Sequence, residues 1–314
     1  MKLPSLPQSS WPYTRACYVT AGLAIVALVV LTMLSPNASA SSQYHFTSVT
    51  TNILRITIII PIAIAWLFGV RGATAFKAYA GMINGSPEAS AINLIANGLL
   101  LTVLFFVVSG LIGSLLPFYR HSAGYEALIV LHDHVGSLFS LAVFYVLYRG
   151  SDRLHRVTRF QTWTRNSAWI LVAFAIFAIA FVLLFTSYRA TSSAGGSPNS
   201  LTYISSNILL ITLIAPYLAG WFMGIITCIN ISRFAGQVKG KLYRQALHNL
   251  VRGLWTVIIL SMAIQIITFA SRYLAGMSLA GVLLLLYALL VLYALGFLFV
   301  REGAKKLAQL EIIP

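Results

Sequence analysis

Eight long apolar stretches follow one another along the chain, with short polar segments between them. At about 1.5 Å per residue, each is long enough to cross roughly 30 Å of hydrocarbon as an α-helix. The apolar positions run without the strict alternation of a transmembrane β-strand. The pattern therefore predicts an all-α, polytopic membrane helix bundle of eight transmembrane helices. Their approximate limits are Tyr18–Ser35, Asn52–Val70, Ile92–Leu116, Glu126–Tyr148, Ala168–Tyr188, Asn207–Ile229, Leu250–Ala270 and Leu279–Val300.

The amino-acid composition agrees with a membrane protein. Hydrophobic residues make up 59% of the chain and charged residues 9%, whereas about 25% of a soluble domain is charged. The two cysteines, Cys17 and Cys228, offer neither a disulfide framework nor the spacing of a metal site. We therefore expect no metal and no cofactor.

The positive charges predict the orientation of the bundle. Of the 21 lysines and arginines, all but four lie at the two termini or in the loops after the second, fourth and sixth spans. Loops rich in positive charge stay on the cytoplasmic side. This predicts a multi-pass protein of the cytoplasmic (inner) membrane with both termini in the cytoplasm. The exceptions are Arg55, Arg120, Arg189 and Arg272.

The net charge of +15 also bears on partners. Because the charges are divided among several short loops, they favour anionic lipid headgroups over nucleic acid.

Residues 1–40 have two interpretations. A basic start, an apolar run and an A-x-A pattern at 38–40 are typical of a removable signal peptide. A retained first helix is favoured, because the internal repeat needs a first span.

An internal repeat relates the two halves of the chain. Between residues 47 and 99, 16 of 53 positions are identical to the residue 155 positions later, including proline, tryptophan and glycine. This predicts a duplication with four spans in each half, and therefore two halves of the same orientation. The halves are residues 1–148 and 168–300, a basic linker at 149–167 joins them, and 301–314 form a cytoplasmic tail. Within the linker, apolar residues at every third position favour a short interfacial helix, with a solvated linker as the alternative.

The residues shared by the halves have structural explanations. Pro61 and Pro216 each remove one hydrogen bond inside a span and predict a kink, which is also a candidate gate. The threonine four residues before each proline has a hydroxyl that suits the freed backbone groups. Trp66 and Trp221 are interpreted as anchors at the inner interface. In the loop before the third span, Ser86 and Pro87 predict a helix start.

A polar cluster in the fourth span is the main candidate site. His132 and His134 lie about 200° apart on a helix, so they are poorly placed to bind one metal ion together. Asp133 shares a helical stripe with other polar residues, and ionisable residues inside a span are functional candidates by default. The candidate binding or polar-pathway residues are Arg55, Glu126, His132, Asp133, His134, Ser137, Ser140 and Gln265.

The cluster has three interpretations. A proton or solute pathway would use Asp133 with a neighbouring histidine. A haem site needs axial histidines at matched depth, which His248, near the inner end of the seventh span, does not provide. The third interpretation is a polar contact that holds helices together.

We also predict that Arg55 pairs with Asp133, because the residue 155 positions after each of them is uncharged, so that the second half lacks both charges. Glu126 is the alternative partner of Arg55.

Two classes of function follow from these patterns. The first is a protein that binds or transports a small solute or ion between its duplicated halves. The second is a structural or scaffold subunit of a membrane complex, with other subunits as partners. An enzyme is not expected, because the chain has no phosphate-binding glycine motif, HExxH or GxSxG. The absence of lysine from every predicted span excludes a retinal Schiff base.

Overall fold

The computed structural model describes residues 48–115, 125–158, 170, 172, 174–176, 178, 201–238, 240–273 and 279–309. The predicted first span, Tyr18–Ser35, lies outside these residues. So does the predicted fifth span, Ala168–Tyr188, apart from six residues in helical conformation. The signal-peptide alternative also falls outside them.

Six long helices and no strand make up the continuous part of what is described. They are α2 (Ser48–Met82), α3 (Pro87–Leu115), α4 (Tyr125–Thr158), α6 (Leu201–Gln237), α7 (Lys241–Tyr273) and α8 (Leu279–Gln309). Each contains a stretch long and apolar enough to cross a membrane. Large apolar side chains such as Leu131, Leu138 and Ile259 are exposed on the outside of the bundle, as lipid contact requires. The architecture is that of an integral, multi-pass membrane protein.

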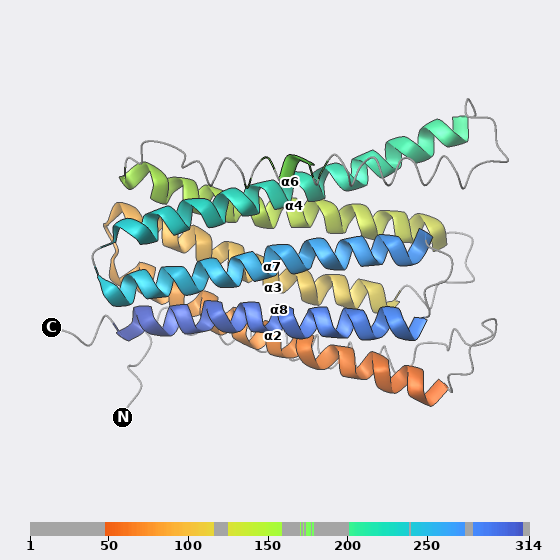
Figure 1. Ribbon diagram of the computed structural model, residues 1–314, viewed down its shortest axis with the longest axis horizontal. Coiled ribbons are helices and arrows are strands. Elements are labelled where there is room, and N and C mark those ends of the chain that lie inside the picture. The colour runs from red at the N-terminus through yellow and green to blue at the C-terminus, as the bar shows by residue number, and fades with distance from the viewer. Residues whose placement is uncertain are drawn as a thin grey trace.

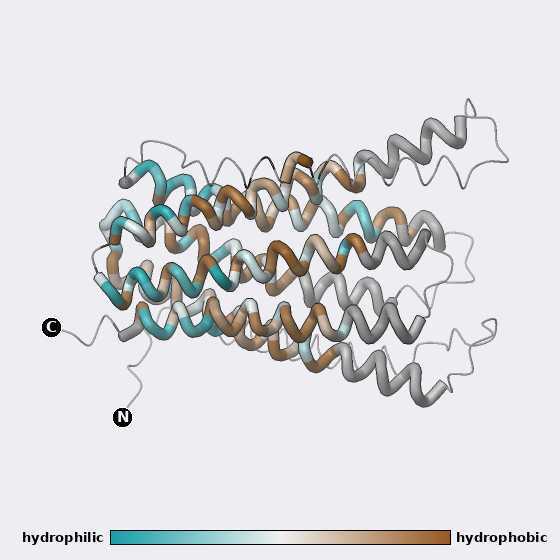
Figure 2. Tube along the Cα trace, viewed as in Figure 1, coloured by the Kyte–Doolittle hydropathy of each residue, from teal (hydrophilic) through white to brown (hydrophobic). Residues whose placement is uncertain are grey.

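The bundle has one distinctly polar end. Among the residues coloured in Figure 2, hydrophilic positions gather where α2, α4, α6 and α8 end and where α3 and α7 begin. We call this the basic end, because Lys77, Arg153, Arg244 and Lys305 are exposed there. The opposite ends of these helices carry the predicted outer halves of the spans.

A tight turn at residues 83–86 joins α2 to α3 at the basic end. Gly85 has a φ of +93°, which residues with a side chain rarely adopt. The Ala89 N–H donates to Ser86 Oγ over 3.2 Å, and α3 begins at Pro87. The predicted helix start is therefore confirmed.

The helices continue past the predicted spans at the basic end. α2 ends at Met82, twelve residues beyond the predicted limit, and α4 ends at Thr158 instead of Tyr148. Leu154, predicted to belong to a separate interfacial helix, is fully buried on α4. Residues 149–158 thus continue the helix of the span, and the division into two halves and a linker stays a prediction. Residues 159–167 lie outside the described part.

The six helices form a closed ring. Each packs on two neighbours, in the order α2, α3, α4, α6, α7, α8 and back to α2. Figure 1 shows them side by side, with α2 next to α8 although they are far apart in sequence. The last helix of each predicted half therefore packs on a helix of the other half.

Glycines bring the helices of two hairpins into backbone contact. On α3, a Cβ added at Gly98 would lie 2.6 Å from the Leu147 side chain of α4. On α7, a Cβ at Gly253 would lie 2.6 Å from the carbonyl oxygen of Gly296 on α8. Such approach increases van der Waals contact between helices that gain little from the hydrophobic effect in lipid. The hairpins α3–α4 and α7–α8 are thus closely packed units.

The helices that contain a proline each pack on one of these hairpins. On α6, a Cβ at Gly220 would lie 3.2 Å from Phe144 of α4, and Asn230 Nδ2 donates to Ser151 Oγ of α4 over 3.4 Å. On α2, a Cβ at Gly72 would lie 2.9 Å from Val300 of α8. We therefore distinguish two three-helix groups, α3–α4–α6 and α7–α8–α2. They meet at two seams, α2–α3 and α6–α7.

The prolines and tryptophans of the repeat lie within the bundle. Pro61 and Pro216 are each inside an uninterrupted helix. Trp66 and Trp221 are only 9% and 1% exposed. The Trp221 indole N–H donates to Ser261 Oγ on α7 over 2.9 Å. Their interpretation as interfacial anchors is wrong, because the ring of helices encloses both indoles.

Candidate functional site

A cavity of about 210 Å³ lies at the centre of the ring. It is near the middle of each helix, and therefore near the middle of the membrane-crossing part. All six described helices contribute to its wall. The lining residues are Ile62, Thr102, Phe105, Ser140, Val143, Phe144, Tyr217, Ser261, Ile264, Gln265 and Tyr293.

Two polar side chains of the cavity wall stand out by their hydrogen bonding. Hydroxyls in these helices usually donate to their own backbone one turn earlier, as Thr102 does to the Gly98 carbonyl over 2.8 Å. Among the described residues, neither the Ser140 hydroxyl nor the Gln265 carboxamide has a hydrogen-bond partner. Both groups face the cavity. They leave hydrogen-bonding capacity for a guest molecule or for water.

Aromatic rings form much of the remaining wall. Phe105 comes from α3, Phe144 from α4, Tyr217 from α6 and Tyr293 from α8. The hydroxyl of Tyr217 lies against Gly136 on α4, where a Cβ would come within 3.2 Å of it. Among the described residues that line it, there is no Asp, Glu, Lys, Arg or His. The cavity is therefore apolar and aromatic, with a few neutral polar groups.

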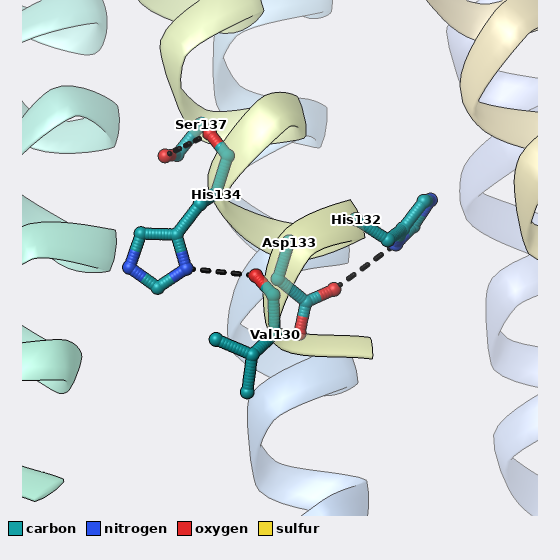
Figure 3. Close-up of polar contacts among 5 residues, drawn as sticks. All are labelled: Val130, His132, Asp133, His134 and Ser137. Atoms are coloured by element: carbon teal, nitrogen blue, oxygen red, sulfur yellow. Dashed lines mark hydrogen bonds and ion pairs between the residues drawn. The ribbon is translucent and has the colours of Figure 1, made fainter. Parts of the chain in front are cut away.

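The polar cluster of the fourth span lies in the first half of α4, away from the basic end. Figure 3 shows His132 and His134 pointing to opposite sides of the helix, with Asp133 between them. His134 Nδ1 is 2.8 Å from the Val130 carbonyl oxygen, and its Nε2 is 3.1 Å from Thr212 Oγ1 on α6. Because a carbonyl only accepts, Nδ1 carries a proton. In the neutral ring the threonine then donates to Nε2.

His132 and Asp133 form a local pair. His132 Nδ1 is 3.2 Å from Asp133 Oδ1, and both side chains are less than one-fifth exposed. The other ring nitrogen of His132, Nε2, is buried and has no hydrogen-bond partner among the described residues. Ser137, also in the cluster, donates to the His134 carbonyl over 2.9 Å. Nothing described in this region brings three metal-binding side chains together.

The structure divides the predicted site residues into two sets. Ser140 and Gln265 line the central cavity, whereas the polar side chains from His132 to Ser137 do not. The side chains of Arg55 and Glu126 lie outside the described residues, so the predicted pairing of Arg55 with Asp133 stays a prediction.

Sequence reasoning missed the two tyrosines of the cavity. Tyr217 and Tyr293 are 6% and 2% exposed in the middle of long apolar runs. The only available signal was a phenol at mid-span, away from the interfaces where tyrosine is enriched. The partner of His134, Thr212, was assigned only to the backbone beside Pro216. Its contact with α4 depends on helix packing that a single sequence does not display.

No known protein family, curated protein or solved structure matches this chain. The cavity and the arrangement of the helices are therefore the features that point to a function.

Proposed function

We propose that this protein binds a small solute in the central cavity and moves it across the membrane. The observation that carries the proposal is a cavity near the middle of all six described helices, with two polar groups in its wall that have no hydrogen-bond partner among the described residues. Transporters built from repeats hold their substrates near the bilayer midplane, between the repeats. A purely structural bundle gains nothing from unsatisfied hydrogen-bonding groups at that depth.

A tandem duplication is part of the proposal. The order of contacts repeats around the ring: α2–α3, α3–α4 and α4–α6 have counterparts in α6–α7, α7–α8 and α8–α2. Gly69 on α2 packs against Val103, and Gly224, 155 positions later, packs against Ile258, also 155 positions later. Equal contacts at equal spacing support two halves of one orientation.

The fourth helix of each half fits a slightly shorter offset. Gly150 packs on Ala91 of α3, and Gly303, 153 positions later, packs on Ala246 of α7. At this offset the counterpart of Asp133 is Leu286. The charged cluster remains a feature of the first half alone.

The two three-helix groups are the moving parts in this proposal. Each group is held by glycine contacts and by polar contacts such as His134 with Thr212. Polar contacts that cross the seams include Lys77 Nζ, which donates to Asn97 Oδ1 over 3.4 Å, and the Trp221 indole, which donates to Ser261. Tilting one group against the other opens the cavity alternately to each side, as rocking of repeats does in other folds.

The basic end faces the cytoplasm in this proposal, with both termini on that side of the inner membrane. Exposed lysines and arginines at this end suit anionic lipid headgroups. We expect single cysteines placed near 40, 120, 195 and 275 to react with a membrane-impermeant thiol reagent added outside intact cells. Cysteines in 149–167 should react only after the membrane is opened. Labelling of this linker from outside would overturn the orientation.

A scaffold subunit of a membrane complex is the second candidate. Close glycine packing within the two groups and the lack of charge in the cavity wall favour it. Such a protein would expose part of its apolar exterior to other subunits, and its cavity would hold no solute.

An uptake experiment separates the two candidates. The wild-type protein is reconstituted into vesicles and given a mixture of small metabolites, and the vesicle contents are measured by mass spectrometry. We expect a solute to accumulate with wild type but not with Gln265→Leu, which removes a polar group from the cavity wall. The control, Thr227→Val, removes a hydroxyl that bonds its own backbone outside the cavity wall and should retain uptake. Absence of any uptake by folded wild-type protein would contradict transport.

A further inference from the structure

We infer that the central cavity accepts an uncharged molecule of one aromatic ring that carries a hydrogen-bonding group, in the size range of a substituted phenol. This inference rests on the proposed function and adds the chemical class of its solute. Four properties of the cavity wall support it: volume, charge, ring content and the two unpaired polar groups.

The volume sets the size of the guest. The cavity measures about 210 Å³, and an apolar protein cavity of about 150 Å³ holds one benzene molecule. The cavity therefore has room for one ring and for a few additional heavy atoms. A sugar chain or a nucleotide is too large for this space, whereas a monatomic ion would leave most of it empty.

The wall chemistry excludes a charged guest. Among the described residues, no acidic or basic side chain lines the cavity, so an ion would lose its hydration without gaining a counter-charge. On α4, the basic side chains on either side of the lining residues are His134, six residues before Ser140, and Arg149, five residues after Phe144, and neither lines the cavity. An uncharged guest meets no such penalty.

The aromatic side chains favour a planar guest. Phe105, Phe144, Tyr217 and Tyr293 reach the cavity from four different helices. Aromatic rings prefer offset-stacked or edge-to-face contact with another ring. Rings that come from several sides therefore provide a surface for a flat molecule, and less for a branched aliphatic one.

The unpaired polar groups fix the chemistry of the substituent. The carboxamide of Gln265 offers donors and an acceptor, and the Ser140 hydroxyl offers both as well. They approach from α7 and α4, which belong to different three-helix groups. Ser261, on the same face of α7, already accepts the Trp221 N–H. A hydroxyl, amide or ring N–H on the guest would thus satisfy Ser140 or Gln265 and would contact both moving groups.

Three matched probes test the inference on the wild-type protein. They are p-cresol, which has a ring and a hydroxyl; p-xylene, which has the same shape without a polar group; and benzoate, which is charged. Binding is measured in detergent by equilibrium dialysis and by the concentration-dependent rise in Tm. We expect p-cresol to bind about tenfold more tightly than p-xylene, the ratio expected of one hydrogen bond. Benzoate should not bind.

Variants assign the binding to the cavity. The double variant Ser140→Ala with Gln265→Leu should bind p-cresol and p-xylene equally, because both polar partners are gone, and Thr227→Val, which removes a hydroxyl outside the cavity wall, should behave as wild type. Equal binding of p-xylene and p-cresol by wild type would overturn the polar part of the inference, and binding of benzoate would overturn the uncharged part. Since these comparisons use the wild-type protein, they hold even where a variant does not fold.

The vesicle experiment keeps this inference distinct from the proposed function. If none of the probes binds but a different solute accumulates in vesicles, the solute class is wrong and transport stands. If no probe binds and no solute accumulates, both proposals fail. A cavity that holds only water or a lipid acyl chain would give that second result.

Discussion

At the residue scale, the polar side chains of the membrane interior serve two purposes. Most close on their own helix or on one partner, as Thr227 does by donating to the Met223 carbonyl over 2.8 Å. Among the described residues, Ser140 and Gln265 have neither kind of partner. The sequence pattern selected Ser140 because it shares a helical stripe with Asp133, and Gln265 because it shares a face of its span with other polar residues. It could not separate them from Ser137, because the difference lies in which groups the neighbouring helices bring near.

The contact between His134 and Thr212 joins α4 to α6 and gives a prediction at this scale. Thr212→Val keeps the shape of the side chain and removes the hydroxyl that meets His134 Nε2 at 3.1 Å. We expect the free energy of unfolding in detergent to fall by about 1 kcal/mol. The matched control is Thr227→Val on the same helix, whose hydroxyl bonds only its own backbone. Equal Tm losses for the two variants would show that the contact with His134 contributes nothing.

At the scale of the helices, hydropathy predicts the existence and order of the six described spans but not their ends. α2 continues to Met82 through Arg71 and Lys77, because a helix extends until its backbone hydrogen bonds stop, whereas hydropathy marks only the part inside hydrocarbon. The two tryptophans were placed at the interface by the general preference of indole. Their burial follows from the ring of helices, which no single span reveals.

The glycine contacts between helices give the second prediction. At Gly253, a Cβ would lie 2.6 Å from the Gly296 carbonyl oxygen of α8, a backbone atom that does not move without separating the helices. We expect Gly253→Ala to lower the free energy of unfolding by about 2 kcal/mol. Gly236→Ala, in a helix with open space around the new methyl group, should be neutral or stabilising. Equal Tm changes in the two variants would mean that α7 and α8 do not pack this closely.

At the scale of the whole molecule, the repeat indicates which helices correspond but not which are neighbours. A repeated sequence is compatible with two separate four-helix bundles. In the structure, α2 packs on α8 and α6 packs on α4, so each proline-containing helix lies against a helix of the other predicted half. The packing of α2 on α8 depends on complementary surfaces such as Gly72 against Val300. The central cavity follows from it, since it lies between groups drawn from both halves.

Disulfides that lock the seams test whether the two three-helix groups move. Gly69 on α2 packs against Val103 on α3, and Gly224 on α6 packs against Ile258 on α7. Each contact lies on a seam. A Cβ at Gly69 would meet a γ-carbon of Val103, one bond from the Val103 Cβ, so cysteines at this pair are within bridging distance. A Cβ at Gly224 would meet the terminal δ-carbon of Ile258, so the extent of bridging at the second pair is measured directly. The background for these variants lacks the native cysteines at positions 17 and 228.

We expect oxidation of either seam pair to stop uptake into vesicles, and a reducing agent to restore it. The control pair, Gly220→Cys with Leu141→Cys, lies within the group α3–α4–α6, where a Cβ at Gly220 would be 3.4 Å from the Cα of Leu141. This disulfide joins helices that move together, so uptake should persist after oxidation. Gel mobility of a protease-nicked sample measures how far each bridge forms. Full uptake with both seams bridged would show that the groups do not move, and loss of uptake with the control pair alone would place the moving boundary between α4 and α6.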